Sequence, residues 1–221
     1  MSKINPELSK KFLHEIKNCE EKLVQIDGIQ IQTRKNVFPP QSKFSHSSIE
    51  LHHVFGDVKG KTVLDIGTGT GIQAIRVAKM GAKLVIASDI SGEAINCANE
   101  NIRNNGAENI VRVIKSDLFD SVPNEKFDLI IANLPITDFP IYGVVESSLY
   151  DPNYQLHKRF LGQAKHHLTN NGFIVMTHIN FKGENDFKDF ERMLEKYEYS
   201  IFGHEEIKAI GYRWRYYRIQ V

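Results

Sequence analysis

Short apolar runs alternate with amphipathic stretches from residue 62 to the end of the chain. The apolar runs are TVLDIG, KLVIASD, IVRVIKSD, FDLIIANL and GFIVMTHI. Residues 72–80 and 93–104, which lie between such runs, carry apolar side chains at helical spacing. Two more strand candidates, YSIFG and RWRYYRIQV, follow a charged helix predicted over residues 186–196. Strands that alternate with helices predict a parallel sheet covered by helices on both faces.

The N-terminal part of the chain follows different patterns. Apolar residues recur on one helical face over residues 8–23, and Asn5 and Pro6 suit the N-cap and first position of such a helix. Apolar and polar residues then alternate on both sides of Asp27-Gly28, which predicts two short strands joined by a type I′ turn. The segment VFPPQSKFSHSS has no period and predicts a loop, with a helix beginning near Ser47.

Composition and charge limit the class of protein. A chain of 221 residues with 41% hydrophobic residues can bury the core of one domain. Its formal net charge of +1 gives no overall attraction to nucleic acids or acidic membranes. The first twelve residues lack the apolar stretch of a signal peptide, and no run reaches the roughly 18 residues that span a bilayer. Cys19 and Cys97 have no paired spacing. We therefore expect a cytoplasmic protein with no disulfide framework and no membrane contact.

The segment VLDIGTGTG, residues 63–71, leads from an apolar strand through a glycine-dense turn into a helix. Glycines allow a sharp turn and let the backbone approach a ligand closely, although a purely structural turn has the same composition. Asp89 closes the next strand about 20 residues later, where a carboxylate accepts hydrogen bonds from ribose hydroxyls. The loop and Asp89 together favour a ligand that contains a nucleoside.

A nicotinamide dinucleotide would suit the same arrangement, because its pyrophosphate binds at the N-terminus of a helix. Two details oppose this interpretation. Asp65 brings a negative charge to the loop, which would repel a pyrophosphate but attract the ammonium group of an amino-acid cofactor. The glycines at 67, 69 and 71 also lack the G-x-G-x-x-G spacing.

Four segments, DIGTGTG, SDI, SDLF and FDLIIANLP, together resemble the motif series of class I S-adenosylmethionine-dependent methyltransferases, over about Phe38 to Val221. The resemblance implies an α/β, Rossmann-like fold with a seven-stranded, mostly parallel sheet in the order 3-2-1-4-5-7-6 and the last strand antiparallel. It also implies that S-adenosylmethionine is the cofactor and that S-adenosylhomocysteine is the product.

The same resemblance implies roles for individual residues. Asp65 and the glycine loop would hold the methionine moiety, Asp89 the ribose, and Asp117 with Leu118 the adenine. The cofactor-binding residues expected on this basis are Asp65, Gly67, Thr68, Gly69, Gly71, Asp89, Ile90, Asp117, Leu118 and Asn133.

The segment NLPI, which begins at Asn133, resembles the [N/D]PP[Y/F/I] motif of the small-domain group that includes protein-glutamine and ribosomal RNA guanine N-methyltransferases. In that group the asparagine side chain and a backbone carbonyl accept hydrogen bonds from a planar nitrogen. This chain departs from the motif at Leu134, where proline is usual, and at Ile136, which cannot stack as an aromatic ring does. The resemblance makes Asn133 and Pro135 the candidate catalytic residues. The candidate substrate-binding residues are Phe38, Pro39, Ile136, Phe139 and Tyr142.

The hairpin that leads to VFPP also resembles the segment before the core domain in that group. We therefore divide the chain into residues 1–46, a helix, hairpin and loop expected to cover the active site, and residues 47–221, the methyltransferase domain. The acceptor is left open between a nitrogen of a protein side chain or RNA base and a small molecule in a biosynthetic N- or O-methylation. A non-catalytic S-adenosylmethionine-binding partner subunit is a third hypothesis.

Other titratable and aromatic residues have two interpretations each. For a hydroxyl acceptor, Asp138, His46 and His178 are candidate bases by location. The pairs His52-His53 and His166-His167 suggest a metal, but adjacent helical residues point about 100° apart, and we expect no metal site. The C-terminal GYRWRYYRIQV suits a contact with nucleic acid, and the alternation of a last strand explains it equally well.

Overall fold

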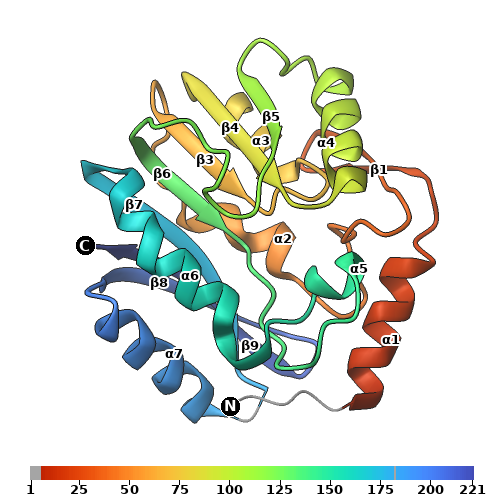
Figure 1. Ribbon diagram of the computed structural model, residues 1–221. Helices are drawn as coiled ribbons and strands as arrows, with labels where there is room; N and C mark the ends of the chain where they lie inside the picture. The colour runs from red at the N-terminus through yellow and green to blue at the C-terminus, as the bar shows by residue number, and fades with distance from the viewer. Residues whose placement is uncertain (1–5, 182) are drawn as a thin grey trace.

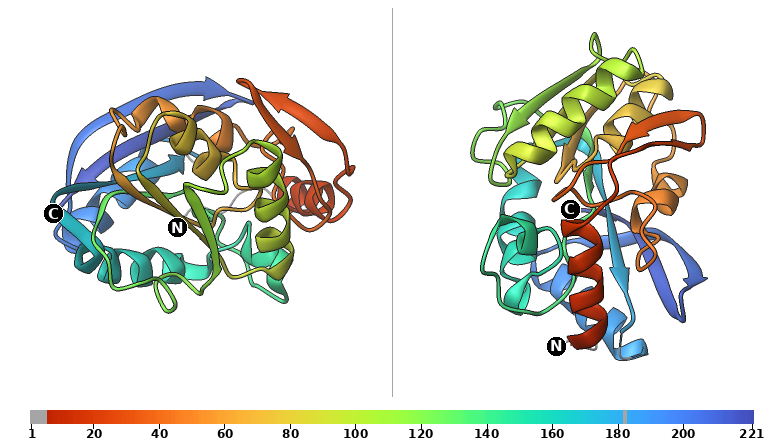
Figure 2. Two further views of the ribbon diagram at one scale, coloured as in Figure 1. Left: turned by 90° about the horizontal axis from the view of Figure 1, so that it is seen from above. Right: turned by 90° about the vertical axis from the view of Figure 1, so that its right-hand side faces the viewer.

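The computed structural model describes residues 6–181 and 183–221, and the predicted N-cap Asn5 lies outside them. A seven-stranded sheet forms the centre of this part of the chain, and helices lie on both of its faces (Figures 1 and 2). Its strands, in chain order, are β3 (Thr62–Ile66), β4 (Leu84–Asp89), β5 (Val111–Lys115), β6 (Phe127–Ala132), β7 (Leu168–Ile179), β8 (Ser200–Ala209) and β9 (Tyr212–Gln220).

The helices connect the strands and cover the sheet. They are α1 (Pro6–Lys17), α2 (Ser47–Glu50), α3 (Ile72–Lys79), α4 (Gly92–Asn104), α5 (Val144–Ser147), α6 (Gln155–Ala164) and α7 (Glu184–Lys196). Short 3-10 helices are η1 (Leu51–Val54), η2 (Pro152–Tyr154) and η3 (Lys165–His167). Side chains of α3 and α4 pack on one face of the sheet, and side chains of α6 and α7 pack on the other.

The strand order in the sheet is β5-β4-β3-β6-β7-β9-β8. Numbered from β3 as the first strand, this is the order 3-2-1-4-5-7-6. β9 runs antiparallel to both of its neighbours, β7 and β8, whereas the pairs from β5 to β7 are parallel. The prediction of a Rossmann-like sheet with an antiparallel last strand is therefore confirmed.

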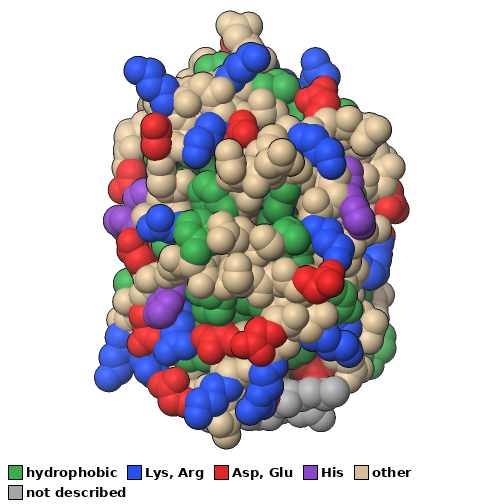
Figure 3. Space-filling view, turned by 90° about the vertical axis from the view of Figure 1, so that its left-hand side faces the viewer, with side chains coloured by type: hydrophobic (Ala, Val, Ile, Leu, Met, Phe, Trp, Pro, Cys, Tyr) green, Lys and Arg blue, Asp and Glu red, His purple; other side chains and the backbone are tan. Residues whose placement is uncertain are grey.

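Strand β9 explains the mixture of arginine and aromatic residues near the C-terminus. Trp214 is buried in the core under α3, and Tyr217 is buried in the core on the opposite face of the sheet. Arg215 forms ion pairs with Glu191 at 2.9 Å and Glu206 at 2.7 Å. Basic and acidic side chains are intermingled over the face in Figure 3, which is the left-hand side of Figure 1. Strand alternation therefore accounts for this sequence.

The hairpin of β1 (Leu23–Ile26) and β2 (Ile29–Gln32) has the predicted turn, since Asp27 and Gly28 have φ values of 49° and 75°. Its isoleucines belong to the core that α3 and α4 share. The side chain of Asn101 in α4 accepts a hydrogen bond from the Gln32 backbone N–H at 2.7 Å. The hairpin thus lies against these helices, and the connection that follows it leads to the carboxyl edge of the sheet (Figure 2).

Helix α1 packs at a different place from the hairpin. Phe12 and Ile16 are buried against Leu149 and Tyr150, which follow α5. Phe38 lies 5.3 Å from Phe12 between ring centroids, so the loop after the hairpin joins this small cluster. The N-terminal segment therefore contacts the rest of the protein through two separate surfaces.

Gly71 sets the approach of α3 to α4. It precedes α3 with a φ of 83°, and a Cβ there would lie 3.3 Å from Cα and Cβ of Ala98. We expect Gly71→Ala to lower the free energy of unfolding by about 1–3 kcal/mol, because left-handed strain and the close approach both cost energy. Urea unfolding measures this loss. Gly92→Ala is the control, since Gly92 has open space at its Cβ and a φ outside the left-handed region; equal losses would contradict the explanation.

Candidate active site

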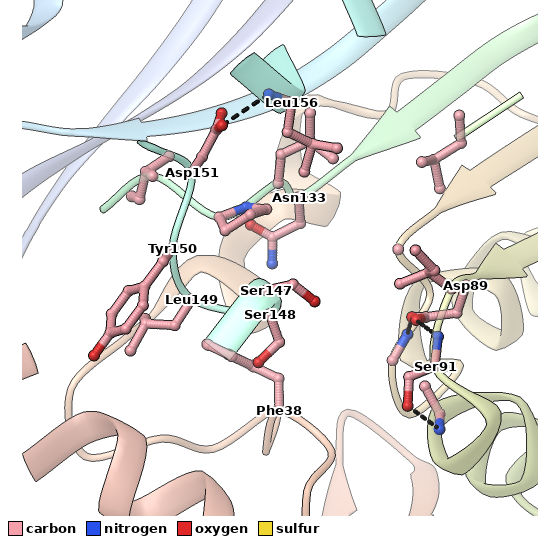
Figure 4. A pocket seen from close by; sticks show the side chains of 18 of the residues that line it. Phe38, Asp89, Ser91, Asn133, Ser147, Ser148, Leu149, Tyr150, Asp151 and Leu156 are labelled. Atoms are coloured by element: carbon pink, nitrogen blue, oxygen red, sulfur yellow. Dashed lines mark hydrogen bonds between the residues drawn. The ribbon is translucent and has the colours of Figure 1, made fainter. Parts of the chain in front are cut away.

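Strands β3, β4 and β6 run parallel and end at the same edge of the sheet, where a pocket of about 380 Å³ opens. Figure 4 shows Asp89 and Ser91 on one side of this pocket and Tyr150 and Leu149 on the other, with the Asn133 side chain between them. Every cofactor-binding residue expected from the sequence lines the pocket, except Gly71. The structure therefore brings these residues together in one cavity.

The backbone amides of the glycine loop are used inside the protein. The N–H groups of Gly67 and Thr68 donate to the carbonyl of Ser88 at 2.8 and 2.9 Å, and the Gly69 N–H donates to Asp89 Oδ2 at 2.9 Å. Gly67 and Gly69 have positive φ values and open space where a Cβ would stand. The loop thus offers room beside its backbone, while these three amides are not free for a pyrophosphate, which agrees with the rejection of a dinucleotide.

Asp65 is buried at the end of β3 and lines the floor of the loop. Thr68 Oγ1 donates to Asp65 Oδ2 at 2.6 Å. Burial raises the pKa of Asp65 to about 7, and the hydrogen bond from Thr68 opposes that rise only in part. A carboxyl group in this state ionises readily when a cation approaches it.

Asp89 closes β4 with its carboxylate held in a fixed position. Its Oδ1 accepts the Ser91 N–H at 2.9 Å, while its Oδ2 is the acceptor for Gly69. Burial raises the pKa of Asp89, and these backbone hydrogen bonds lower it. Each oxygen retains a further lone pair, so the carboxylate can accept hydrogen bonds from two vicinal hydroxyls.

Asp117 and Leu118 follow β5 and line the pocket beside Asp89. Leu118 has a φ of 49° and is buried, while the Asp117 carboxylate accepts a hydrogen bond from Arg159 of α6 at 2.9 Å. Ile90, which lies between the strand end and α4, is half exposed at the pocket. A flat ring bounded by these residues would have apolar contacts and one carboxylate at its edge.

Asn133 comes directly after β6. Its Nδ2 lies 3.1 Å from Ser47 Oγ and 3.3 Å from Ser48 Oγ, so both amide hydrogens have partners in α2. Pro135 and Ile136 line the pocket next to it. The side-chain oxygen of Asn133 is left as an acceptor at the pocket.

The two departures from the NPPY-like motif lie on opposite sides of the sheet. Leu134 is buried in the core beneath α6. Ile136 packs on the other side, in the cluster that holds Phe181 and Trp214. Both of those aromatic residues line the pocket. The aromatic wall that the fourth motif position lacks is thus present on β9 and the segment before α7.

Of the five predicted substrate-binding residues, two line the pocket and three lie elsewhere. Phe38 and Ile136 line the pocket. Pro39 lines a second cavity between α1 and the loop that follows the hairpin. Phe139 packs on Tyr150 with ring centroids 5.5 Å apart, and the side chain of Tyr142 is 89% exposed.

The candidate bases for a hydroxyl acceptor lie outside the pocket wall. Asp138 Oδ1 accepts the Asn153 N–H at 3.0 Å, and His46 precedes α2. His178 is buried and stacks on Phe190 with centroids 4.3 Å apart, and burial lowers its pKa to about 3. A histidine in that state stays neutral and does not take up a proton at neutral pH.

Sequence reasoning missed several polar residues of the pocket. Ser47 and Ser48 were recognised only as the start of a helix, and their contact with Asn133 spans more than 80 residues of sequence. Asp151 is buried, and its carboxylate accepts the Leu156 N–H at 2.7 Å and faces His157 Nδ1 at 2.7 Å. An aspartate just before a proline at a helix start is a capping signal that could have identified Asp151.

The strand order and the polar edge of the sheet define a Rossmann-like methyltransferase fold. Residues 28–202 match the methyltransferase small domain family. The chain therefore belongs to this family and is an S-adenosylmethionine-dependent methyltransferase.

Similar proteins include a putative protein N5-glutamine methyltransferase from Methanocaldococcus jannaschii, which is 31% identical over 170 residues, or 74% of this chain and 83% of the relative. Ribosomal protein L11 methyltransferase from Alkaliphilus oremlandii is 50% identical over 76 residues, which cover 34% of this chain and only 24% of that protein. The crystal structure of the ribosomal protein L11 methylase from Lactobacillus delbrueckii subsp. bulgaricus superposes with a TM-score of 0.61 at 28% identity and covers 83% of each chain.

Within residues 6–181 and 183–221, no helix is both long and apolar enough to cross a membrane. No group of three or more histidine, cysteine, aspartate or glutamate side chains is arranged to hold a metal ion in the same residues.

Raising the pH from about 4 to 7 should lower the free energy of unfolding through Asp65. The carboxyl keeps its proton up to about pH 7 in the folded chain and loses it near pH 4 in the unfolded chain, so rising pH favours unfolding. Asp65→Asn keeps the shape of the side chain but does not titrate. It therefore removes the contribution of this carboxyl to the pH dependence of the free energy of unfolding. Urea unfolding of both proteins between pH 5 and 7 measures the difference, and parallel profiles would contradict the effect of burial.

Proposed function

We propose that this protein transfers the methyl group of S-adenosylmethionine to a carboxamide nitrogen of a protein acceptor. The observation that carries the proposal is Asn133, which lies in the same pocket as the glycine loop with both amide hydrogens already bonded and its oxygen available. The sulfonium of the cofactor supplies a methyl group with its own leaving group. The protein has to align the acceptor nitrogen with that methyl group.

The pocket suits the cofactor in size and in the chemistry of its lining. Gly67 and Gly69 leave space for the methionine moiety, and Asp65 faces it as the partner of an ammonium group. Asp89 offers two acceptors to the ribose, and Asp117 lies at the edge of the adenine position. We assign cofactor binding to Asp65, Gly67, Thr68, Gly69, Asp89, Ile90, Asp117, Leu118 and Asn133, with Gly71 shaping the loop from behind the pocket.

Asn133 gives the acceptor its orientation. Its Oδ1 accepts a hydrogen bond from the acceptor N–H, which turns the nitrogen lone pair toward the methyl group. Such an acceptor needs no strong base, because the proton that it loses after transfer passes to water. Pro135, next to Asn133, holds the backbone at the mouth of β6.

The lining favours a neutral acceptor. Among the described residues that line the pocket, the only cation is Arg159, and it is bound to Asp117. Asp151 is occupied by hydrogen-bond donors of its own helix. Trp214 is 2% exposed, lines the pocket beside Ile136, and its indole N–H has no partner among the described residues. An indole donor suits a carbonyl oxygen, and a phosphate finds no free cation here.

The N-terminal segment, residues 1–46, forms part of the acceptor side in this proposal. Phe12 of α1 and Phe38 and Phe44 of the following loop line the pocket. The hairpin lies against α3 and α4 instead. We assign acceptor contact to α1 and the loop, with Phe38 and Ile136 nearest to the acceptor.

A protein carboxamide is favoured over an RNA base by the neutral lining and by the relative from Methanocaldococcus jannaschii, which carries the name of a glutamine methyltransferase and matches over most of both chains. The L11 methyltransferases match over about a quarter of their length, so the likeness to them carries less weight for the acceptor.

The protein should transfer label from methyl-labelled S-adenosylmethionine to material in a cell extract that protease degrades. Protease-sensitive label, with methylated glutamine or asparagine found after digestion, is the expected result, because the acceptor side is neutral. Asp89→Ala is the control that should abolish cofactor binding. Label that only ribonuclease removes would indicate an RNA base, and label confined to small molecules would indicate a biosynthetic acceptor; either would overturn the proposal.

Asn133→Ala should reduce the rate of methyl transfer by about 100-fold or more, as expected when one preorganised polar contact to the reacting group is lost. The affinity for S-adenosylmethionine, measured by calorimetry, should change much less than the rate. Asn96→Ala serves as the matched control at an exposed position of α4. A variant at 133 with an unchanged rate would show that the acceptor is not oriented by this amide.

A further inference from the structure

The amide of Asn133 is held by a helix that comes from a distant part of the sequence. Its nitrogen lies 3.1 Å from Ser47 Oγ and 3.3 Å from Ser48 Oγ, and both serines are buried. Ser47 Oγ in turn lies 2.9 Å from Ser45 Oγ. The hydroxyls of three serines therefore form one polar group behind a single side chain of the pocket.

An asparagine side chain can present either its oxygen or its nitrogen to a ligand, and the two orientations have almost the same shape. When Ser47 donates its proton to Ser45, its free lone pair accepts an amide hydrogen from Asn133, and it has no proton left for a carbonyl. A flipped amide would then bring two oxygens together. In this arrangement Ser47 selects the orientation in which Asn133 turns its oxygen to the pocket.

Helix α2 consists of one turn, and its backbone is fixed by side chains of α3. Gln73 Nε2 donates to the Ser48 carbonyl at 2.6 Å, and Arg76 Nη1 lies 3.3 Å from the carbonyls of Ser48 and Ile49. Since a helix of one turn has too few backbone hydrogen bonds to be stable by itself, these contacts help to determine where the serine hydroxyls lie.

Arg76 is itself held by the hairpin turn. Its side chain is 6% exposed, and its Nη2 donates to Asp27 Oδ2 at 2.6 Å. A buried guanidinium without a carboxylate partner is strongly unfavourable. The contact thus links the turn of β1–β2, through α3 and α2, to the residue at the mouth of β6.

We propose that Ser47 and Ser48 are positioning residues for methyl transfer, and that Asp27 and Arg76 fix the helix that carries them. The hydroxyls orient the Asn133 amide toward the acceptor nitrogen, and the hairpin contributes to catalysis through this chain of contacts without lining the pocket. The inference rests on the proposed function, in which Asn133 contacts the acceptor.

Threonine and valine at 47 and 48 form a matched test in the full-length protein, because they have the same shape and only threonine has a hydroxyl. The probe is the side-chain NH₂ signal of Asn133 in a nitrogen-15 correlation spectrum, assigned by its loss in Asn133→Ala. We expect Ser47→Val/Ser48→Val to shift this signal and speed its hydrogen exchange at least tenfold, and the double threonine variant to restore both. Equal signals from the two double variants would overturn the positioning role.

The same variants are then compared in methyl transfer to the protease-sensitive fraction of extract. The valine pair should lose at least tenfold in rate at saturating S-adenosylmethionine with its affinity for that cofactor unchanged, and the threonine pair should recover it. Thr177→Val is the control, because it removes a buried hydroxyl that has no partner among the described residues. Absence of transfer by the wild-type protein would count against the proposed function alone, since the amide signal needs no acceptor.

Asp27→Asn tests the distant end of the chain of contacts. We expect it to move the Asn133 signal in the same direction as the valine pair and to reduce the transfer rate by a smaller factor. Asp57→Asn is the control at an exposed aspartate that binds only a nearby backbone N–H. If the Asn133 signal is unchanged in Asp27→Asn, the hairpin does not contribute to positioning the amide. The role of the serines is then decided by the valine and threonine variants alone.

Discussion

The pairing register of β3, β4 and β6 is the constraint on which the site depends. Ile66 pairs with Ser88 on one side and with Ala132 on the other. The next residues are Gly67, Asp89 and Asn133, so they stand at one level where the three strands end. Because both faces of these strands are buried in apolar cores, polar chemistry can emerge only where the strands end.

The parts of the fold that were predictable are those with local signals. The strands have continuous apolar runs, and Asp27-Gly28 determines its turn by backbone conformation alone. The strand order came from resemblance to a family, because hydrophobic periodicity does not specify which strands are neighbours. The helix near Ser47 proved to be one turn followed by a 3-10 turn, since its end is set by Arg76 and Gln73 from another element.

The residues proposed for the cofactor could be identified in the sequence because they lie in short segments at strand ends. Those proposed for the acceptor could be identified only in part, because they come from distant regions of the chain. Trp214 reaches the pocket from the last strand, and Ser47 reaches it from α2. Phe139 and Tyr142 are near Asn133 in sequence, yet packing on Tyr150 and exposure to solvent keep them out of the wall. A residue that follows Asn133 closely in the sequence therefore need not line the pocket.

The closed hydrogen bonding of the glycine loop has a consequence for the energetics of turnover. The amides of Gly67, Thr68 and Gly69 are satisfied by the end of β4 without any ligand, so the loop loses its conformational entropy when the chain folds. Binding then requires little ordering, and preorganisation of this kind preserves affinity. In the proposed binding mode the loop faces the amino-acid and nucleoside groups, which S-adenosylhomocysteine shares with the cofactor. The loop itself would then not distinguish product from cofactor, and only the groups that face the sulfonium could do so.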